Sequence, residues 1–451
     1  MRLILLSGGS GKRLWPLSND TRSKQFIKAM DSNNCALDFQ TSMLQRVWAH
    51  LRAIDMTDSV VIAASRVQQE VIHAQLGDDV PLVLEPEKRD TFPAICLASS
   101  FLYSKMNSNY DEVIVVMPVD VDADEGFFDA IKQFAVDFED SEASIGLIGL
   151  HPTHPSEKFG YILRSDKQIS SNLIKVDRFV EKPSMEEATR LIGEGALWNC
   201  GVFVFRLGYM INLLEASGWS TQHEEILQQY HLLPSISFDY QVVERETDIV
   251  FKPYSGRWND LGTWNDWTAT MSDRIHGKAI MSDDCNNTHV INELQIPVVA
   301  MGLSDAVIVA SPDGILVANK PSTPKLKDLV HSIASRPMYE ETIYGWYRVI
   351  DVDNKYGQQV ITKRVHVWSG KHISYHNHMK RTEIWTIISG RAEVVMDDRK
   401  FYVAAGDIVS IEAGVKHAIK AIGEVDMIEV QIGESISDDD IARFKYDWND
   451  S

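Results

Sequence analysis

Cysteine, long apolar runs and basic residues are all scarce in this chain of 451 residues. The four cysteines lie far apart with no C-x-x-C pair, which favours a reducing compartment over a disulfide framework. No run approaches the roughly 18 apolar residues of a membrane span. The chain also enters a strand-like run directly, without the pattern of a signal peptide. We therefore expect a cytoplasmic protein with no membrane partner.

Positive charge is also scarce. The chain has 44 Lys and Arg residues against 64 Asp and Glu residues, which gives a formal net charge of -20. Nucleic acids require a basic face, so this balance argues against a nucleic-acid partner. The hydrophobic content of 44% is that of an ordinary globular protein. The length predicts two or three domains.

The one basic stretch follows the first strand-like run, residues 3–6, and its glycine-rich turn, residues 7–11. Such a turn lets backbone N–H groups approach a ligand. Residues 11–28 hold five cations and one anion, a local reversal of charge that indicates an anionic ligand. We expect Arg13 and Lys24 to supply positive charge to phosphate oxygens.

The spacing excludes two familiar phosphate-binding loops. There is no G-x-x-x-x-G-K-[ST], and Leu14 stands where the dinucleotide pattern requires glycine. The run G-G-S-G-x-R-L-W-P-L-S, followed by K-Q-F, instead resembles the opening motif of sugar-nucleotide pyrophosphorylases, in the form typical of mannose-1-phosphate guanylyltransferases. This resemblance implies GTP and mannose 1-phosphate as substrates. It also implies a nucleotide site made by Ser7, Gly8, Gly9, Gly11 and, from a similar loop at 85–95, Arg89.

Short β-rich runs at 60–64, 82–84, 113–117 and 145–150 alternate with amphipathic segments such as 38–51 and 91–106. The alternation predicts a mostly parallel sheet covered by helices, with ligands beyond the carboxyl ends of its strands. Asp120 follows one such strand. A carboxylate there is well placed to hold Mg²⁺, although an isolated Asp after a strand more often begins a turn.

Further blocks stand in the order in which the pyrophosphorylases carry them: K-F-G-Y-I at 158–162, F-V-E-K-P at 179–183, W-N-C-G at 198–201, S-F-D-Y-Q at 237–241 and W-N-D-L-G-T-W at 258–264. The resemblance implies that Asp120 and Asp260 hold Mg²⁺ and that Lys182 meets the sugar phosphate. The sugar contacts that it implies are Gly160, Glu181 and Asn199.

The C-terminal third carries a second constellation. Gly370, His376-x-His378, Glu383 and Gly390 fit the first cupin motif, and His417 belongs to the second. His376 and His378 are two residues apart, so on a strand they point to the same face, where Glu383 and His417 can complete a His₃Glu site. These ligands suit Zn²⁺ or another divalent transition metal.

These patterns predict an α/β protein with three parts. They are a nucleotidyltransferase domain with a mixed, mostly parallel sheet (1–275), a short β-helix-like connector with a linker (276–338) and an all-β cupin barrel (339–451). The resemblance implies a mannose-1-phosphate guanylyltransferase that is a homodimer. Two alternatives stay open: a bifunctional enzyme whose cupin is also a mannose-6-phosphate isomerase, and a non-catalytic sugar-nucleotide sensor on the same fold. Lys380 and Ile384 depart from the bifunctional pattern, and Asp90 departs from the nucleotide loop.

Overall fold

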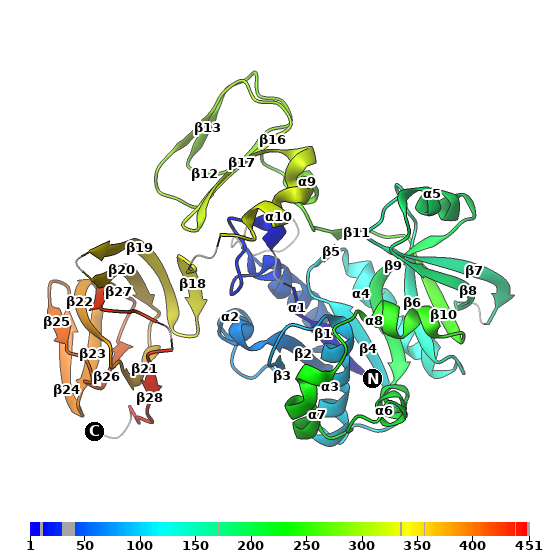
Figure 1. The fold of residues 1–451 in the computed structure, drawn as a ribbon, viewed down its shortest axis with the longest axis horizontal. Helices are drawn as coiled ribbons and strands as arrows, with labels where there is room; N and C mark the ends of the chain where they lie inside the picture. Colours follow the sequence, from blue (N-terminus) through cyan, green and yellow to red (C-terminus); the bar gives the residue numbers. More distant parts are fainter. Residues whose placement is uncertain are drawn as a thin grey trace. The chain divides into compact units, whose positions relative to one another are not determined.

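The computed structural model describes residues 1–9, 12–28, 41–169, 172–333, 336–355, 357–437 and 439–448. They fold into two compact units (Figure 1). The first contains residues 1–14, 23–69 and 79–273, and the second contains residues 15–22, 70–78 and 274–451. The short segment 15–22 therefore packs with the second unit, although the chain on both sides of it belongs to the first.

A nine-stranded sheet, in the order β3-β2-β1-β4-β9-β6-β10-β8-β7, forms the centre of the first unit. β1 to β4 are parallel to one another, as the βαβ pattern predicts, whereas β7, β8 and β9 pair antiparallel with their neighbours. The sheet is thus mixed, and the glycine turn follows a strand of its parallel half. The strands are β1 (Arg2–Leu6), β2 (Val60–Ser65), β3 (Leu82–Glu85), β4 (Val113–Pro118), β6 (Ile145–Leu150), β7 (Gly160–Gln168), β8 (Ile174–Glu181), β9 (Leu197–Arg206) and β10 (Ile249–Tyr254).

Helices cover both faces of this sheet, which is why its central strands are apolar throughout rather than alternating. Ile145 and Leu147 belong to a core shared with α3, α6 and α7, whereas Gly146 between them meets Phe134 of α4 on the opposite face. In the described part of the chain, no helix has both the length and the apolar character to cross a membrane. The helices up to residue 269 are α1 (Met43–Ala53), α2 (Gln69–Leu76), α3 (Thr91–Ser104), α4 (Glu125–Glu139), α5 (Met185–Gly193), α6 (Leu207–Ala216), α7 (His223–Gln229), α8 (Phe238–Gln241) and α9 (Trp264–Ala269).

The connector is built from short strands that stack in parallel, as a β-helix-like piece requires. β12, β14 and β16 pair in parallel, β13 pairs in parallel with β15, and β17 closes an antiparallel hairpin with β16. Helix α10 (Leu326–Val330) follows. The connector strands are β12 (Ile275–Gly277), β13 (Ala279–Met281), β14 (His289–Asn292), β15 (Val298–Ala300), β16 (Ala306–Ser311) and β17 (Gly314–Asn319).

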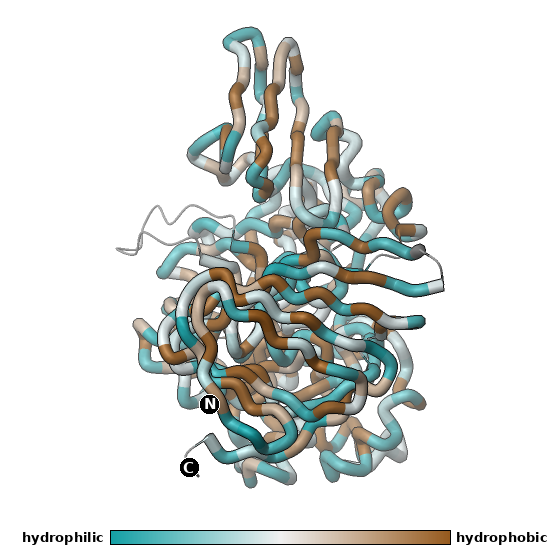
Figure 2. Tube along the Cα trace, turned by 90° about the vertical axis from the view of Figure 1, so that its left-hand side faces the viewer, coloured by the Kyte–Doolittle hydropathy of each residue, from teal (hydrophilic) through white to brown (hydrophobic). Residues whose placement is uncertain are grey.

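The strands from residue 339 onward form two antiparallel sheets, ordered β18-β19-β20-β27-β22-β25 and β24-β23-β26-β21-β28. Apolar side chains from both sheets make one core, and hydrophobic and hydrophilic residues alternate along the strands, as Figure 2 shows. The strands are β18 (Tyr339–Thr342), β19 (Gly345–Lys355), β20 (Gln358–Val367), β21 (His372–Asn377), β22 (Arg381–Ser389), β23 (Arg391–Met396), β24 (Arg399–Ala404), β25 (Ile408–Ile411), β26 (His417–Ala421), β27 (Val425–Gly433) and β28 (Ala442–Arg443).

Candidate active site and metal centre

Two carboxylates meet at the carboxyl end of β4. The short strands β5 (Val121–Ala123) and β11 (Trp258–Asp260) pair antiparallel, with Asp260 opposite Val121, and this brings Asp260 beside Asp120. The ammonium group of Lys24 lies between them, 2.8 Å from Asp120 Oδ2 and 2.9 Å from Asp260 Oδ1. The structure therefore brings together three of the predicted catalytic residues, from segments that are far apart in the sequence.

The charges around Asp260 favour its ionised form. Burial alone would raise the pKa of this carboxyl group, but Lys24 outweighs burial, Lys158 and Arg13 add to its effect, and the pKa is lowered. The two carboxylates likewise raise the pKa of Lys24 against the effect of its own burial. Lys158 is a residue that the sequence analysis did not single out. Its place two residues before Gly160 was the available signal.

The glycine turn presents open backbone next to this site. Gly8 and Gly9 are exposed, and a Cβ atom on either would meet no other atom within 4 Å. Gly9 has a φ of +118°, which favours glycine. Ser7 is buried, its N–H donates to Ala63 O, and its carbonyl accepts a hydrogen bond from Gln25 Nε2. Gly11 lies outside the described residues.

Arg22 and Arg89 are both held by protein groups. Arg22 is buried in a bidentate ion pair with Glu293, so the prediction that the cations of 11–28 mark an anionic ligand does not hold for this residue. Its partner lies 271 residues away, beyond the reach of a local pattern. The guanidinium of Arg89 donates to Leu233 O and to Glu87, at 3.0 and 2.8 Å.

A second group of predicted residues gathers where β7 pairs with β8. Gly160 lies opposite Glu181, and a Cβ atom at Gly160 would come within 2.6 Å of Glu181 Oε2. Glu181 Oε1 is 2.7 Å from the ammonium of Lys182, whereas the buried Oε2 has no hydrogen-bond partner. Lys182 has a left-handed backbone, with φ at +46°. An unpartnered buried carboxylate oxygen beside a cation is suited to a ligand with both a hydroxyl and a phosphate group.

Asn199 on β9 is hydrogen-bonded to Asp239, a residue to which the sequence analysis gave no role. Its Nδ2 donates to Asp239 Oδ1 at 2.8 Å, and its Oδ1 accepts from Gly201 N at 3.2 Å. Burial and, after it, the negative charge of Glu181 raise the pKa of Asp239 to about 7. Asp239 lies in the S-F-D-Y-Q segment that resembles the pyrophosphorylases, and that resemblance was the available signal.

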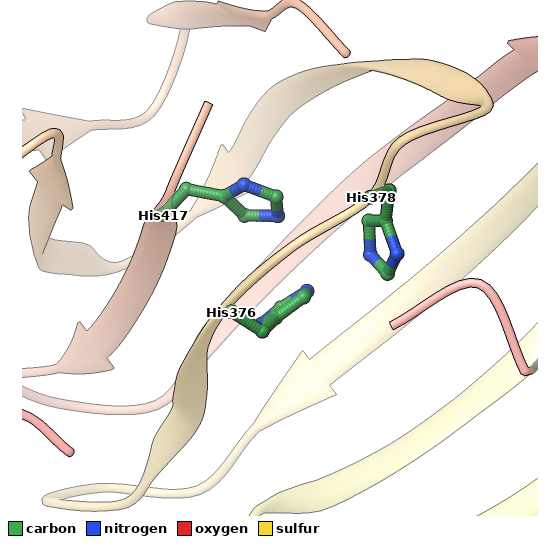
Figure 3. A group of neighbouring side chains, drawn as sticks. All are labelled: His376, His378 and His417. Carbon is green, nitrogen blue, oxygen red and sulfur yellow. The ribbon is translucent and has the colours of Figure 1, made fainter. Parts of the chain in front are cut away.

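Three histidines of the cupin barrel lie close together (Figure 3). His376 on β21 pairs directly with His417 on β26, and His378 follows two residues later on the same side. All three are buried, and their candidate ligand atoms lie within 4.8 Å of one another. The Nδ1 atoms contact the backbone carbonyls of Ser374, Asp440 and Val415. Because a carbonyl only accepts, each Nδ1 carries a proton, and each Nε2 is the atom that would bind a metal.

Glu383 lies beside this triad, 3.3 Å from His378 Nε2 and 3.5 Å from His417 Nε2. The structure thus brings the four predicted ligands together. Burial would raise the pKa of Glu383, but His417, His378 and Arg381 outweigh it and lower the pKa. Arg381, which the sequence analysis did not select, also donates from Nη2 to His378 Nε2 at 2.9 Å.

Polar side chains continue from the triad into the barrel. Gln431 donates to both Glu383 and Glu429, at 3.1 and 2.6 Å, and Lys363 lies 3.9 Å from Glu429. Burial and then the charge of Glu383 raise the pKa of Glu429 to about 7. Gln431 Oε1 is buried and has no hydrogen-bond partner. Such a lining suits a polar ligand better than a purely structural core.

The fold is that of a nucleotidyltransferase domain joined to an isomerase-type cupin. Residues 2–275 match the family described as Nucleotidyl transferase, and residues 329–446 match the family described as Mannose-6-phosphate isomerase C-terminal. The chain belongs to the nucleotidyl transferase family, in the branch that carries this C-terminal domain.

Curated relatives match nearly the whole chain. A xanthan biosynthesis protein, XanB, of Xanthomonas campestris pv. campestris (strain B100) is 31% identical over 98% of this chain and 97% of its own. A mannose-1-phosphate guanylyltransferase of Escherichia coli (strain K12) is 29% identical, with the same coverage of both chains. A solved structure from Thermus thermophilus, described as a mannose-1-phosphate geranyltransferase, has a TM-score of 0.61 and 26% identity, and covers 74% of this chain and 99% of its own.

Proposed function

We propose that the protein is a mannose-1-phosphate guanylyltransferase, which forms GDP-mannose and pyrophosphate from GTP and mannose 1-phosphate. The observation that carries the proposal is the meeting of Asp120, Asp260 and Lys24 beside an exposed glycine turn. Relatives named for this activity, such as the Escherichia coli protein, support the choice of substrates. Other relatives are named for xanthan and alginate biosynthesis, which supports a supply role in polysaccharide synthesis.

The reaction needs positioning and charge neutralisation rather than a covalent intermediate. A phosphate oxygen of mannose 1-phosphate attacks the α-phosphorus of GTP, and the bond to the departing pyrophosphate breaks with its electron pair on the leaving oxygen. Arg13 and Lys24 stabilise the pyrophosphate, and Lys182 holds the attacking phosphate. Asp120 and Asp260 would hold Mg²⁺, which supplies neutralising charge to the phosphates.

The substrate contacts follow from the same geometry. Ser7, Gly8, Gly9, Gly11 and Arg89 are assigned to the nucleotide, as the resemblance implies. Glu181 Oε2, which has no partner within the protein, accepts a sugar hydroxyl in this proposal. Gly160 leaves room for that carboxylate, and Asn199 contacts the sugar in an orientation fixed by Asp239.

Pyrophosphate release with Mg²⁺ and mannose 1-phosphate tests the proposal, with GTP compared against ATP, UTP and dTTP. We expect GTP to be preferred by at least about tenfold in kcat/KM, and Asp260→Asn to abolish turnover without changing the melting temperature by more than a few degrees. Asp58→Asn, at an exposed turn, is the matched control. Release with another nucleotide would replace the named substrate, and no release with any would favour the sensor.

A second activity is proposed for the cupin: interconversion of mannose 6-phosphate and fructose 6-phosphate. The arrangement of three Nε2 atoms beside Glu383, next to the polar lining at Glu429 and Gln431, favours it. His376, His378, Glu383 and His417 would hold Zn²⁺ or another divalent transition metal. Isomerase activity that is lost in His417→Ala while guanylyltransferase activity persists would establish it. Absence of isomerase activity in the metal-loaded wild type would restrict the cupin to a structural role.

We also propose a homodimer and a cytoplasmic location. The connector supports the first, because Ile280 and Val299 lie side by side on β13 and β15 and are 66% and 60% exposed. The free, buried cysteines Cys96, Cys200 and Cys285 support the second. We also propose that the chain divides into domains at 1–275, 276–338 and 339–451.

A further inference from the structure

Residues 15–22, hereafter the strap, join the two cations that the proposed function assigns to pyrophosphate. Arg13 lies two residues before the strap, and Lys24 lies two residues after it. The strap nevertheless packs in the second unit, against the connector. The position of these cations thus depends on what holds the strap.

The first end of the strap fits into the turn between β16 and β17. Trp15 lies so close to Gly314 that a Cβ atom there would come within 2.4 Å of Trp15 Cζ2. Ser311 Oγ donates to the carbonyl of Pro16 at 2.8 Å. In the middle, Asn19 Nδ2 donates to Asp313 Oδ2 at 3.2 Å. The β16–β17 turn therefore packs closely against this indole ring. It is also hydrogen-bonded to the strap residues that follow Trp15.

The second end is held by a charge pair. Arg22 Nη1 and Nη2 lie 3.0 and 2.8 Å from the two carboxylate oxygens of Glu293, a bidentate geometry. The Arg22 guanidinium also lies over the ring of Tyr339 on β18, 5.2 Å from its centre. Arg22 is 8% exposed, so its guanidinium is shielded from water, whereas Glu293 is half-buried. Asn19 Oδ1 completes the local turn by accepting from the N–H groups of Thr21 and Arg22.

We propose that the connector positions the two cations through the chain of the strap: Glu293 holds Arg22, two residues before Lys24, and Gly314 holds Trp15, two residues after Arg13. Both are positioning residues that touch no substrate. Within the first unit, Ser23 Oγ donates to Gly9 O at 3.0 Å, so Lys24 is fixed from both sides. This inference rests on the proposed role of Arg13 and Lys24 in binding pyrophosphate.

The first test is the affinity for Mg²⁺-pyrophosphate, measured by titration calorimetry on the full-length protein. Glu293→Gln keeps the size of the side chain but leaves the buried Arg22 charge without its counter-charge. We expect the Kd for pyrophosphate to rise at least about fivefold. In the reverse reaction, the KM for pyrophosphate should rise equally, whereas the KM for GDP-mannose stays within about twofold. A merely structural defect would lower the fraction of active protein. The apparent kcat would then fall, and both KM values would stay unchanged.

The second test adds a methyl group to the turn. Gly314→Ala places a Cβ atom against Trp15, and the matched control Gly302→Ala adds one elsewhere in the connector, where the nearest atom is 3.6 Å away. Both glycines have positive φ, at +154° and +64°, so both variants carry backbone strain. We expect the two variants to show a similar loss of melting temperature. Only Gly314→Ala should weaken pyrophosphate binding, by at least about threefold.

Unchanged pyrophosphate affinity in Glu293→Gln, or equal weakening in Gly302→Ala and Gly314→Ala, would overturn the inference. So would a wild-type protein that does not bind pyrophosphate. Binding is measured without turnover. A wild type that binds pyrophosphate but transfers no nucleotide would therefore contradict the proposed function and not this inference. The weakening in Glu293→Gln would then still support the positioning role.

Discussion

Glycine at position 160 is required by its neighbours across the sheet. A Cβ atom there would approach Phe179 Cζ to 2.5 Å and Glu181 Oε2 to 2.6 Å, far inside normal contact. Gly160→Ala should therefore displace the carboxylate that faces the sugar. We expect the KM for mannose 1-phosphate to rise at least about tenfold and the KM for GTP to stay within about twofold, as measured by pyrophosphate release.

Gly193 at the end of α5 offers the matched control, because a Cβ atom there meets nothing within 4 Å. Gly193→Ala should leave both KM values unchanged. A parallel rise of the two KM values in Gly160→Ala would mean that the substitution disturbs the whole domain, and Glu181 would lose its assigned role.

Asp239 predicts a pH dependence of stability. Its pKa is raised from 3.8 to about 7 in the fold, so the folded protein binds a proton in this interval that the unfolded chain has released. The stability contributed by that proton is complete below the unfolded pKa and is lost as the pH rises through 7. Asp239→Asn cannot ionise, and its side-chain oxygen can still accept from Asn199. Its melting temperature relative to wild type should therefore increase between pH 5 and pH 8.

At the scale of single elements, the pairing of β21 with β26 sets His376 opposite His417 and so creates the triad. A metal bound there stabilises the fold, because its binding free energy adds to that of folding. Chelation of the metal should lower the melting temperature of the wild type by several degrees. His417→Ala should not respond to the chelator, whereas His331→Ala, at an exposed site, should respond like the wild type. Equal responses of wild type and His417→Ala would place the metal elsewhere.

The elements also show how far the sequence predicts the site. The runs that became β1, β2, β3, β4 and β6 are apolar and bounded by turns, so local pattern was sufficient for them, and the parallel pairing of β1 to β4 followed from it. The pairing of Arg22 with Glu293 was not predictable, since the two lie 271 residues apart. The same holds for the bond between Asn199 and Asp239, which depends on how β9 and α8 pack.

At the scale of the whole molecule, the connector predicts assembly. On the edge strand β17, Ile315 and Val317 flank the buried Leu316 and are 60% and 67% exposed. Exposed edge strands usually carry charged side chains, so this apolar face indicates a contact surface. We expect light scattering to give twice the chain mass for the wild type. Ile280→Asp combined with Val317→Asp should reduce it to the chain mass. Val136→Asp, on an exposed face of α4, is the control and should leave the dimer intact. A double variant that remains dimeric would exclude the connector face.

The strap has a consequence for anyone who wishes to divide this protein. Pro16, Leu17 and Ser18 are buried, and they lie among the connector residues rather than with the sheet that precedes and follows them. A fragment ending at residue 275 would keep these residues and lose the connector residues that pack with them, so the loop between Arg13 and Lys24 would expose apolar side chains. The modules recognised in the sequence are therefore not independently transplantable. A chimaera that exchanges the C-terminal part must exchange residues 15–22 with it.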